Sequence, residues 1–367
     1  MSAFFVIFLL LLALLLQKRL EAHSLDALRE DAAFDASIVE PGRPFHLVVT
    51  LENTRRRYIP FLRVEGNLSP TFHLAAENGT EGERAEPSSG SLAFSTWLRP
   101  RQQARFQIPV FVAQRGRYVL PSLTVCGGDF LGLKKSERAM NPFREVVAPP
   151  RETPEPELGI ALGSFLGELS VSRFLYEDPV LTVGFREYTG REPMKMISWK
   201  QSARAQGLMV KKYDYTVEPS AVVLLNVDTQ SARKPELLEQ CFSLARTVCR
   251  MLEERGVKYA FATNAAMAGA MRDPSLVEEG LGQRHFAVVL ESLGRALHIP
   301  KYSCDQLLSN YAGAYSPACG RILITPAGEA DKSPVLPLLK GASGGNVLII
   351  RGEAFYHDDP ELSSDAV

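Results

Sequence analysis

The sequence is poor in the residue patterns that mark catalytic and metal-binding proteins. Its five cysteines are an odd number and contain no CxxC pair, so we interpret them as free thiols or small buried apolar residues. Its six histidines are scattered, and none pairs with a cysteine or serine in a local catalytic motif. The stretch GASGG (341–345) lacks the lysine and hydroxyl residue of a phosphate-binding loop. We therefore predict a protein that is not an enzyme and has no cofactor.

The chain also lacks a net charge of either sign. It has 41 Lys and Arg residues and 42 Asp and Glu residues, and this balance gives no global reason to expect nucleic acid as a partner. The length of 367 residues suits about two domains. A hydrophobic content of 46% with 23% charged residues is ordinary for globular proteins and is enough to form real cores.

One long apolar run is present, at the N-terminus. Residues 3–16 are unbroken apolar and are followed by Gln17, Lys18 and Arg19. No basic residue precedes the run and no small-residue cleavage site follows it, which favours a single-span membrane anchor over a secretory signal or a peripheral helix. The two basic residues after the run predict that the soluble domains are cytoplasmic. Residues 20–33 have a helical pattern and are predicted to continue the anchor.

The next part of the chain has a β texture. From Phe34 onward, short runs such as FHLVVTLEN and SLAFSTWL alternate with glycine, proline and asparagine, which is typical of an antiparallel β-sandwich. Residues 75–90 are polar and are expected to form a hairpin tip. The proline-rich stretch 148–157 disfavours helix and central strand, and it predicts a linker between domains.

The pattern changes after residue 218. Residues 221–228 form a continuous apolar run ending in Asp228, as in a strand buried on both faces. A helix over 235–256, a strand over 257–263, a helix over 285–297, and strands over 321–325 and 346–352 follow. This alternation predicts an α/β domain with a parallel sheet and helices on both faces.

A segment rich in cations and aromatics, residues 184–215, separates these two parts. MISWKQSARA within it predicts a short helix in which Ile197, Trp199 and Ala203 are partly buried. Three interpretations compete. It could bind phosphate or nucleic acid, dock an acidic protein through Trp and Arg, or clamp the chain internally with Trp199 as a core residue.

The same segment resembles the signature of the domain of unknown function 58 family, and RGRY (115–118) and GGDFLGL (127–133) are similar to other landmarks of that family. Gly190-Arg191 replaces the family's Gly-Asp pair, and Lys195 replaces an arginine. The resemblance implies a membrane-associated protein that ends in a von Willebrand A-like (Rossmann-like) domain and is commonly encoded beside MoxR-type AAA+ ATPases and transglutaminase-like proteins. The signature falls on Arg186, Tyr188, Gly190, Lys195, Ile197, Trp199, Ser202, Ala203, Arg204, Leu208 and Val210.

Asp228 stands where a metal-binding von Willebrand A domain begins its Asp-x-Ser-x-Ser motif. Here Gln230 and Ala232 occupy the two serine positions, so the oxygen ligands that a divalent cation needs are missing. We predict a degenerate site without metal, in which Asp228 caps the next helix or binds loop amides.

Together these features predict an α+β multi-domain protein. Residues 1–33 form the anchor and its extension, 34–148 the β-sandwich, 149–183 a linker and connecting segment, 184–218 the signature segment, and 219–367 the A-like domain. The expected function is that of a non-enzymatic interaction or scaffold protein of the cell membrane, tethered to the bilayer by residues 3–16 and partnered by an AAA+ ATPase. Two alternatives stay open: an extracellular adhesion or ligand-binding A-domain protein, and a hydrolase that uses Asp228 with a distant histidine.

Overall fold

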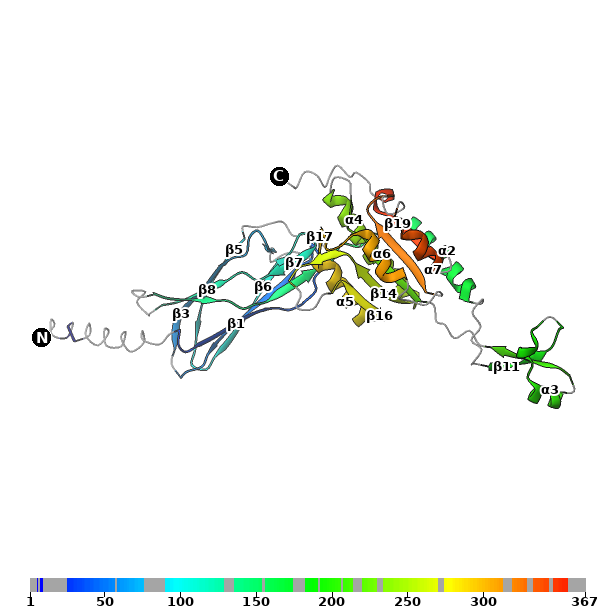
Figure 1. Ribbon diagram of the computed structural model, residues 1–367. Coiled ribbons are helices and arrows are strands. Elements are labelled where there is room, and N and C mark those ends of the chain that lie inside the picture. The colour runs from blue at the N-terminus through cyan, green and yellow to red at the C-terminus, as the bar shows by residue number, and fades with distance from the viewer. Residues whose placement is uncertain are drawn as a thin grey trace. The chain divides into compact units, whose positions relative to one another are not determined.

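The computed structural model describes most of the chain outside its N-terminal segment and its last residues (Figure 1). Contacts divide the chain into two units, Met1–Arg151 and Glu152–Val367, and each is considered by itself. The predicted anchor lies outside the described residues except at Phe5, Ile7 and Phe8, as do Lys18, Arg19 and nearly all of the polar tip. The described residues are 5, 7–8, 25–56, 58–75, 90–128, 135–153, 156–173, 182–190, 192–205, 207–213, 220–229, 234–269, 274–312, 319–328, 333–342 and 346–355.

Within those ranges, no helix combines the length and the apolarity that crossing a lipid bilayer requires. The anchor assigned to residues 3–16 therefore stays a prediction from the sequence.

The N-terminal unit is built from antiparallel sheets (Figure 1). One four-stranded sheet has the order β1 (Leu28–Phe34), β2 (Phe45–Asn53), β6 (Gln103–Phe111) and β4 (His73–Leu74). The other has the order β5 (Ser91–Leu98), β3 (Ile59–Asn67), β8 (Leu123–Gly128) and β9 (Lys135–Met140). A two-stranded ribbon pairs β10 (Glu145–Ala148) with β7 (Gly116–Val119).

Both four-stranded sheets contribute to one apolar core. Alternate residues of β2, namely Leu47, Val49 and Leu51, are fully buried in the same cluster as Leu62 and Val64 of β3. Successive side chains of a strand point to opposite faces, so this alternation gives each sheet one apolar side. Full burial of each such aliphatic side chain stabilises the unit by roughly 1.5–3 kcal/mol.

The prediction that residues 20–33 are helical is wrong for its second half. Leu28–Phe34 form strand β1, which pairs with β2 from Leu28↔Asn53 to Phe34↔Leu47. Leu28 and Ala32 are buried in the core of the unit. Pairing with β2 supplies hydrogen bonds and an apolar neighbour, and this tertiary context overrides the weak helical preference of LREDAAF.

The C-terminal unit contains a five-stranded sheet of order β16, β14, β13, β18, β19. The expected strands are present as β13 (Ser220–Leu225), β14 (Lys258–Thr263), β18 (Gly320–Thr325) and β19 (Val347–Arg351), and they are parallel. The sequence did not reveal β16 (Leu276–Gly280), which runs antiparallel to β14. The sheet is therefore mixed and mostly parallel.

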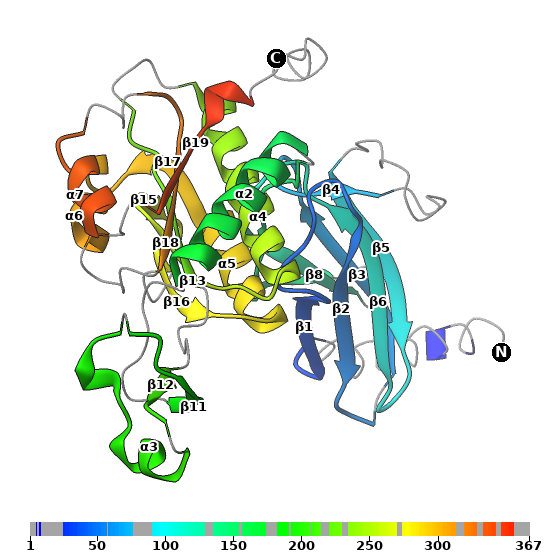
Figure 2. The same ribbon diagram turned by 90° about the vertical axis from the view of Figure 1, so that its right-hand side faces the viewer.

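Helices cover both faces of this sheet, as predicted (Figure 2). On one face, Val223 and Leu225 of β13 join a cluster with α4 (Pro235–Glu254) and α5 (Gln283–Arg295). On the other face, Val222 and Leu224 join a cluster with α6 (Cys304–Ala312) and α7 (Leu336–Ala342). The C-terminal unit also contains the ribbon of β15 (Ala265–Met267) with β17 (Ala296–Pro300), and the 3-10 turn η3 (Gly352–Ala354).

A helix occupies the segment expected to be a linker. α2 spans Pro156–Arg173, and Leu158, Leu162 and Phe165 on it are buried in the α4-side cluster of the C-terminal unit. Proline is tolerated in the first turn of a helix, so Pro156 begins α2 rather than preventing it. Gly320 makes room for this packing, since a Cβ there would lie 2.7 Å from the Phe165 ring.

The burial of α2 leads to a testable expectation. Leu162→Ala should destabilise the C-terminal unit by about 2–5 kcal/mol, because it leaves a cavity in a fully buried position. Ile160→Ala on the same helix, at a position 74% exposed, should change stability by less than about 0.5 kcal/mol. Native-state amide exchange of α4 measures both, and equal protection in the two variants would show that α2 is not part of this core.

Candidate functional site

The signature segment folds into a small structure that we call the signature lobe, residues 182–213. It consists of β11 (Thr182–Glu187), the 3-10 turn η1 (Met194–Met196), α3 (Trp199–Ala205) and β12 (Met209–Tyr213). β11 and β12 pair antiparallel from Thr182↔Tyr213 to Glu187↔Met209. Ile197 bridges Val210 of β12, and both side chains are buried. The short helix predicted from MISWKQSARA is thus present, and Ile197 is buried as expected.

Ser202 joins α3 to β12. Its hydroxyl donates to the carbonyl of Ser198 at 2.9 Å and accepts the amide hydrogen of Met209 at 2.8 Å. The amide of Ser198 in turn donates to the carbonyl of Met209 at 2.8 Å. The serine of the signature therefore has a structural role that a residue without a hydroxyl could not fill.

Glu192 holds the turn between β11 and η1. Its carboxylate pairs with the guanidinium of Arg186 and accepts hydrogen bonds from the Thr189 amide at 3.1 Å and the Thr189 hydroxyl at 2.8 Å. The Thr189 hydroxyl, and after it Arg186, lowers the pKa of Glu192 to about 2 against the opposing effect of burial. Gly190 completes the turn with φ of +87°, a conformation that favours glycine.

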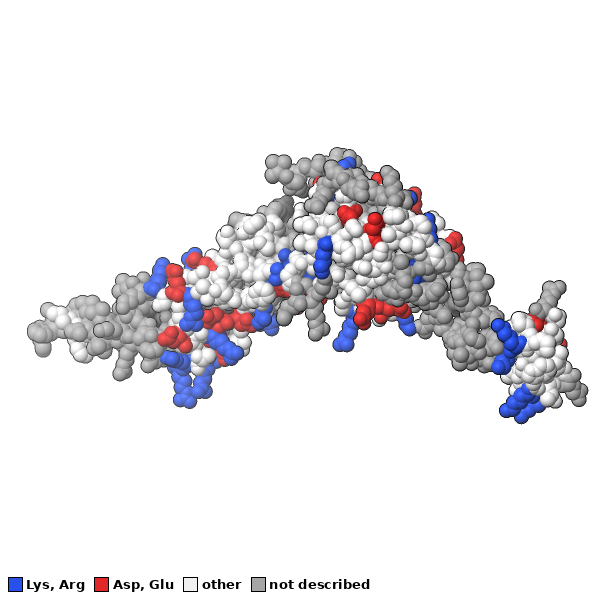
Figure 3. All heavy atoms as spheres, in the orientation of Figure 1, with Lys and Arg blue, Asp and Glu red and all other residues white. Residues whose placement is uncertain are grey.

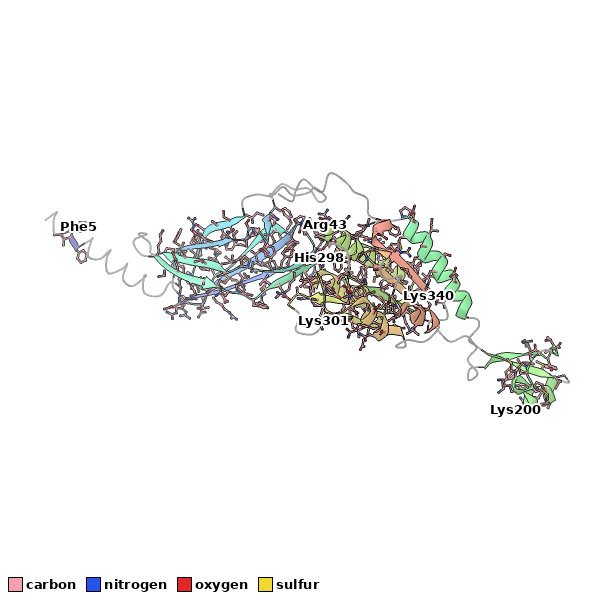
Figure 4. The ribbon with its side chains drawn as sticks, turned by 45° about the horizontal axis from the view of Figure 1, so that its top comes forward. Phe5, Arg43, Lys200, His298, Lys301 and Lys340 are labelled. Carbon is pink, nitrogen blue, oxygen red and sulfur yellow. The ribbon has the colours of Figure 1, made fainter. Side chains whose placement is uncertain are left out.

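The outer surface of the lobe is apolar and cationic. Trp199 is 61% exposed and Met194 is 67% exposed, so the interpretation of Trp199 as a core or partly buried residue is wrong. Ala203 is also exposed. The reason is that Ile197 and Ser198 face β12, and the start of α3 turns the next side chain outward. Lys195, Lys200 and Arg204 are exposed on the same lobe, where Lys200 is labelled in Figure 4.

The other signature residues take different places. Tyr188 is half-buried, and its amide donates to the carbonyl of Leu208 at 2.8 Å. Arg191, the departure from the family pattern, lies outside the described residues. The signature residues therefore divide into a group that builds the lobe and a group that it displays. The first group contains Arg186, Tyr188, Gly190, Ile197, Ser202 and Val210, and the second contains Lys195, Trp199, Ala203, Arg204 and Leu208.

A second candidate site lies at the carboxyl ends of the parallel strands. Asn226 follows β13, Asn264 follows β14, and Thr325 ends β18. The Asn226 amide donates to the Thr325 hydroxyl at 3.2 Å, and the Asn264 amide donates to the Asn226 side-chain oxygen at 2.8 Å. We did not predict these residues, although polar residues directly after buried parallel strands were visible in the sequence.

Asp228 belongs to this edge. Its amide donates to the Asn226 side-chain oxygen at 3.0 Å, and its carboxylate accepts the Cys304 amide at 3.1 Å. It therefore meets the first residue of α6, and not α4, which is the next described helix along the chain. Gln230 and Ala232, which replace the metal-site serines, lie outside the described residues.

Comparison with known proteins adds little. No family model matches the chain, and no curated protein matches it. Solved structures that align include AvmM, which catalyses macrocyclization in alchivemycin A biosynthesis, at 10% identity over 35% of this chain and 93% of that one, with a TM-score of 0.19. The alkylpurine DNA glycosylase AlkC of Pseudomonas fluorescens aligns at 13% identity over 31% of this chain and 30% of that one, with a TM-score of 0.18. Likeness at this level carries no argument about fold or function.

The chemistry of the strand-end edge is that of a structural network. Burial, and then the charges of Asp305 and Asp228, raise the pKa of the Cys304 thiol to about 12, so the thiol beside Asp228 stays protonated at neutral pH. Burial likewise raises the pKa of the Cys241 thiol to about 12. In the described part of the chain, Asp228 has no histidine partner, and no three His, Cys, Asp or Glu side chains are grouped to hold a metal ion.

The Glu192 contacts lead to a prediction about pH. The folded-state pKa of about 2 lies below the ordinary glutamate value of 4.5, so the contacts of the carboxylate stabilise the lobe above pH 4.5 and are lost as the pH falls toward 2. The amide resonance of Thr189 should therefore stay unchanged from about pH 5 to about pH 3.5. Replacing Thr189 by Val removes the hydroxyl donor and should raise the pKa of Glu192. A wild-type midpoint near 4.5 would contradict the assignment.

The role of Asp228 can be tested by two substitutions. Asp228→Ala removes the acceptor at the start of α6 and should weaken protection of the Cys304 amide by about 1 kcal/mol, or about fivefold in exchange rate. Asp228→Asn keeps an acceptor oxygen and should lose only the charge at the helix N-terminus, about 0.3–1 kcal/mol. Unchanged protection in Asp228→Ala would show that the side chain does not hold α6.

Proposed function

We propose that this protein is a non-enzymatic, membrane-anchored interaction protein whose signature lobe docks an acidic surface of a partner protein. The observation that carries the proposal is the exposed Trp199, which shares with the exposed Lys195, Lys200 and Arg204 a lobe fixed by its own hydrogen bonds. Tryptophan and cationic side chains are the residues that dominate binding energy at protein interfaces. A preformed lobe also reduces the ordering cost of binding.

The nature of the partner comes from the resemblance of the sequence. Members of the domain of unknown function 58 family are associated with MoxR-type AAA+ ATPases, and the partner proposed for this chain is such an ATPase. In this proposal the N-terminal unit is a β-sandwich spacer, the C-terminal unit is a von Willebrand A-like domain, and residues 3–16 anchor both on the cytoplasmic side of the membrane. The complex would act in the assembly or maturation of other protein complexes.

The strand-end edge supports a non-enzymatic role. Ligands of open α/β sheets usually enter where the strand order reverses, outside the carboxyl ends of the strands. In this sheet that point lies between β13 and β18, and the Asn226–Thr325 hydrogen bond spans it. Asp228 is engaged by the start of α6, which speaks against its use as the base of a hydrolase. An adhesive A domain would in addition need the serine ligands that Gln230 and Ala232 replace.

Recovery of the partner from detergent-solubilised membranes, with ATP present, tests this proposal. The full chain should retain an AAA+ ATPase, and Trp199→Ala should reduce its retention by roughly 10- to 100-fold, as for a central interface residue. Replacement of Lys195, Lys200 and Arg204 by glutamine should slow association and remove most of its salt dependence.

Matched variants separate docking from folding. Trp199→Phe keeps an aromatic side chain and should retain more ATPase than Trp199→Ala. Ile160→Ala removes an exposed apolar residue of α2, outside the lobe, and should bind as the wild type does. Absence of any ATPase from the wild-type eluate, or equal recovery with Trp199→Ala, contradicts the proposal.

A further inference from the structure

A second surface of the molecule combines aromatic and cationic side chains. It lies in the N-terminal unit, where two connections run side by side: residues 54–58 lead from β2 to β3, and residues 99–102 lead from β5 to β6. Figure 3 shows several Lys and Arg side chains, with Asp and Glu side chains among them, at one end of this unit. We call this surface the arginine–aromatic corner, and its members are Arg55, Arg56, Tyr58, Trp97, Arg99 and Arg101, all exposed.

Hydrogen bonds fix the two connections to each other. The buried Asn53 donates from its side chain to the carbonyl of Arg99 at 2.9 Å, and its amide donates to the carbonyl of Gln102 at 2.9 Å. The amide of Arg101 donates to the carbonyl of Arg55 at 3.1 Å. These hydrogen bonds hold the two connections together, so the arginines of both lie on one surface.

The aromatic rings of the corner are exposed in a defined geometry. Tyr58 and Trp97 stack with ring centroids 5.6 Å apart and 17° between their planes, although the residues are 43% and 45% exposed. The guanidinium of Arg99 lies 5.4 Å from the centroid of the Trp97 ring, within the range of a cation–π contact. The corner thus presents a flat aromatic surface with cations at its edge.

Arg101 adds a sign that its side chain is functional. Its φ of +57° is the one positive value among the non-glycine residues that the structure describes. This conformation is costly for a residue with a Cβ and is cheap for glycine. We take the positive φ of Arg101 as a reason to examine this turn as a binding site, since strained residues cluster at such sites.

The corner lies where the N-terminal segment joins the folded unit. The amide and the hydroxyl of Thr54 both donate to the carbonyl of Ala27 at 2.8 Å. From Ala27 the chain leads back to Arg19, Lys18 and the apolar run that ends at Leu16. Even fully extended, the chain between Leu16 and Ala27 reaches only about 40 Å, so a bilayer that holds the run lies within that distance of Ala27, which contacts the corner through Thr54.

We propose that the arginine–aromatic corner binds the anionic surface of the membrane in which residues 3–16 are anchored. Arginine forms bidentate hydrogen bonds with phosphate, tryptophan and tyrosine favour the headgroup region, and basic residues next to a span are attracted to anionic lipids. Asp26 and Glu52 are the carboxylates beside Ala27 and Thr54, and the four arginines outnumber them. This inference rests on the proposed function only for the membrane position of residues 3–16.

The two tryptophans of the chain allow a direct test. Because Trp97 and Trp199 are the only two, the full chain with Trp199→Phe reports from the corner alone. In vesicles of phosphatidylcholine and phosphatidylglycerol that contain lipid brominated in the acyl chain near the headgroup, Trp97 emission should be quenched at least twofold more than in phosphatidylcholine vesicles without the anionic lipid. Replacing the four arginines by glutamine should reduce quenching to the level of the neutral vesicles.

Controls separate the corner from the rest of the protein. Lys195→Gln, Lys200→Gln and Arg204→Gln together, in the same background, should leave Trp97 quenching unchanged. Arg55→Gln with Arg56→Gln should give an intermediate loss without altering the strained turn, and circular dichroism checks that each variant folds.

Three results would overturn the inference. The first is equal quenching in neutral and anionic vesicles, and the second is quenching that does not respond to the arginine substitutions. The third is a Trp97 response to soluble polyglutamate or to a DNA oligonucleotide without quenching by lipid, which would assign the corner to an acidic macromolecule. If the chain floats with vesicles while Trp97 stays unquenched, only the membrane contact of the corner is contradicted. If the chain does not float, the proposed anchor of residues 3–16 is contradicted as well.

Discussion

The C-terminal unit depends on one strand that is apolar on both faces. In β13, Val223 and Leu225 pack against α4 and α5, while Val222 and Leu224 pack against α6 and α7. Parallel sheets need such double coverage, because both of their faces must be removed from water. The packing of α2, α4, α5, α6 and α7 on the two faces of the sheet follows from this requirement. Polar residues can enter only where the strand stops, and the chain places Asn226 there.

The same constraint explains why the polar residues at the strand ends hydrogen-bond to one another. Asn226, Asn264 and Thr325 are almost fully buried, and buried amides and hydroxyls are costly unless they are hydrogen-bonded. They satisfy one another and the loop before α6, where the Asn264 side chain also donates to the carbonyl of Tyr302 at 3.1 Å. The polar groups that could receive a ligand are thus already used to hold loops.

The parts of the fold that could be predicted are those with a strong period. β13 is a continuous apolar run, and α4 shows apolar residues at helical spacing from Leu238 to Leu252 with Pro235 at its start. β1 and α2 were missed because their conformation depends on residues far away in the sequence. Pairing with β2 makes Leu28–Phe34 a strand. Packing into the core of the C-terminal unit stabilises the helix that carries Leu158 and Leu162. The strand-end network was missed for another reason, since hydrogen bonds between residues such as Asn226 and Thr325 depend on strand order, which periodicity does not contain.

The signature segment and the arginine–aromatic corner show what a neutral net charge can conceal. The formal charge of −1 is a sum over the whole chain, in which local groups of cations are balanced by acidic residues elsewhere. A tryptophan side chain that stays exposed leaves a large apolar area in contact with water. Even so, Trp97 and Trp199 are 45% and 61% exposed. Arg99 lies over the Trp97 ring, and Lys200 follows Trp199 in the sequence. A single exposed tryptophan would need no explanation. Both tryptophans of the chain are exposed on elements that also display cations. This shared feature motivates our two proposals, an acidic protein partner for one surface and anionic lipid for the other.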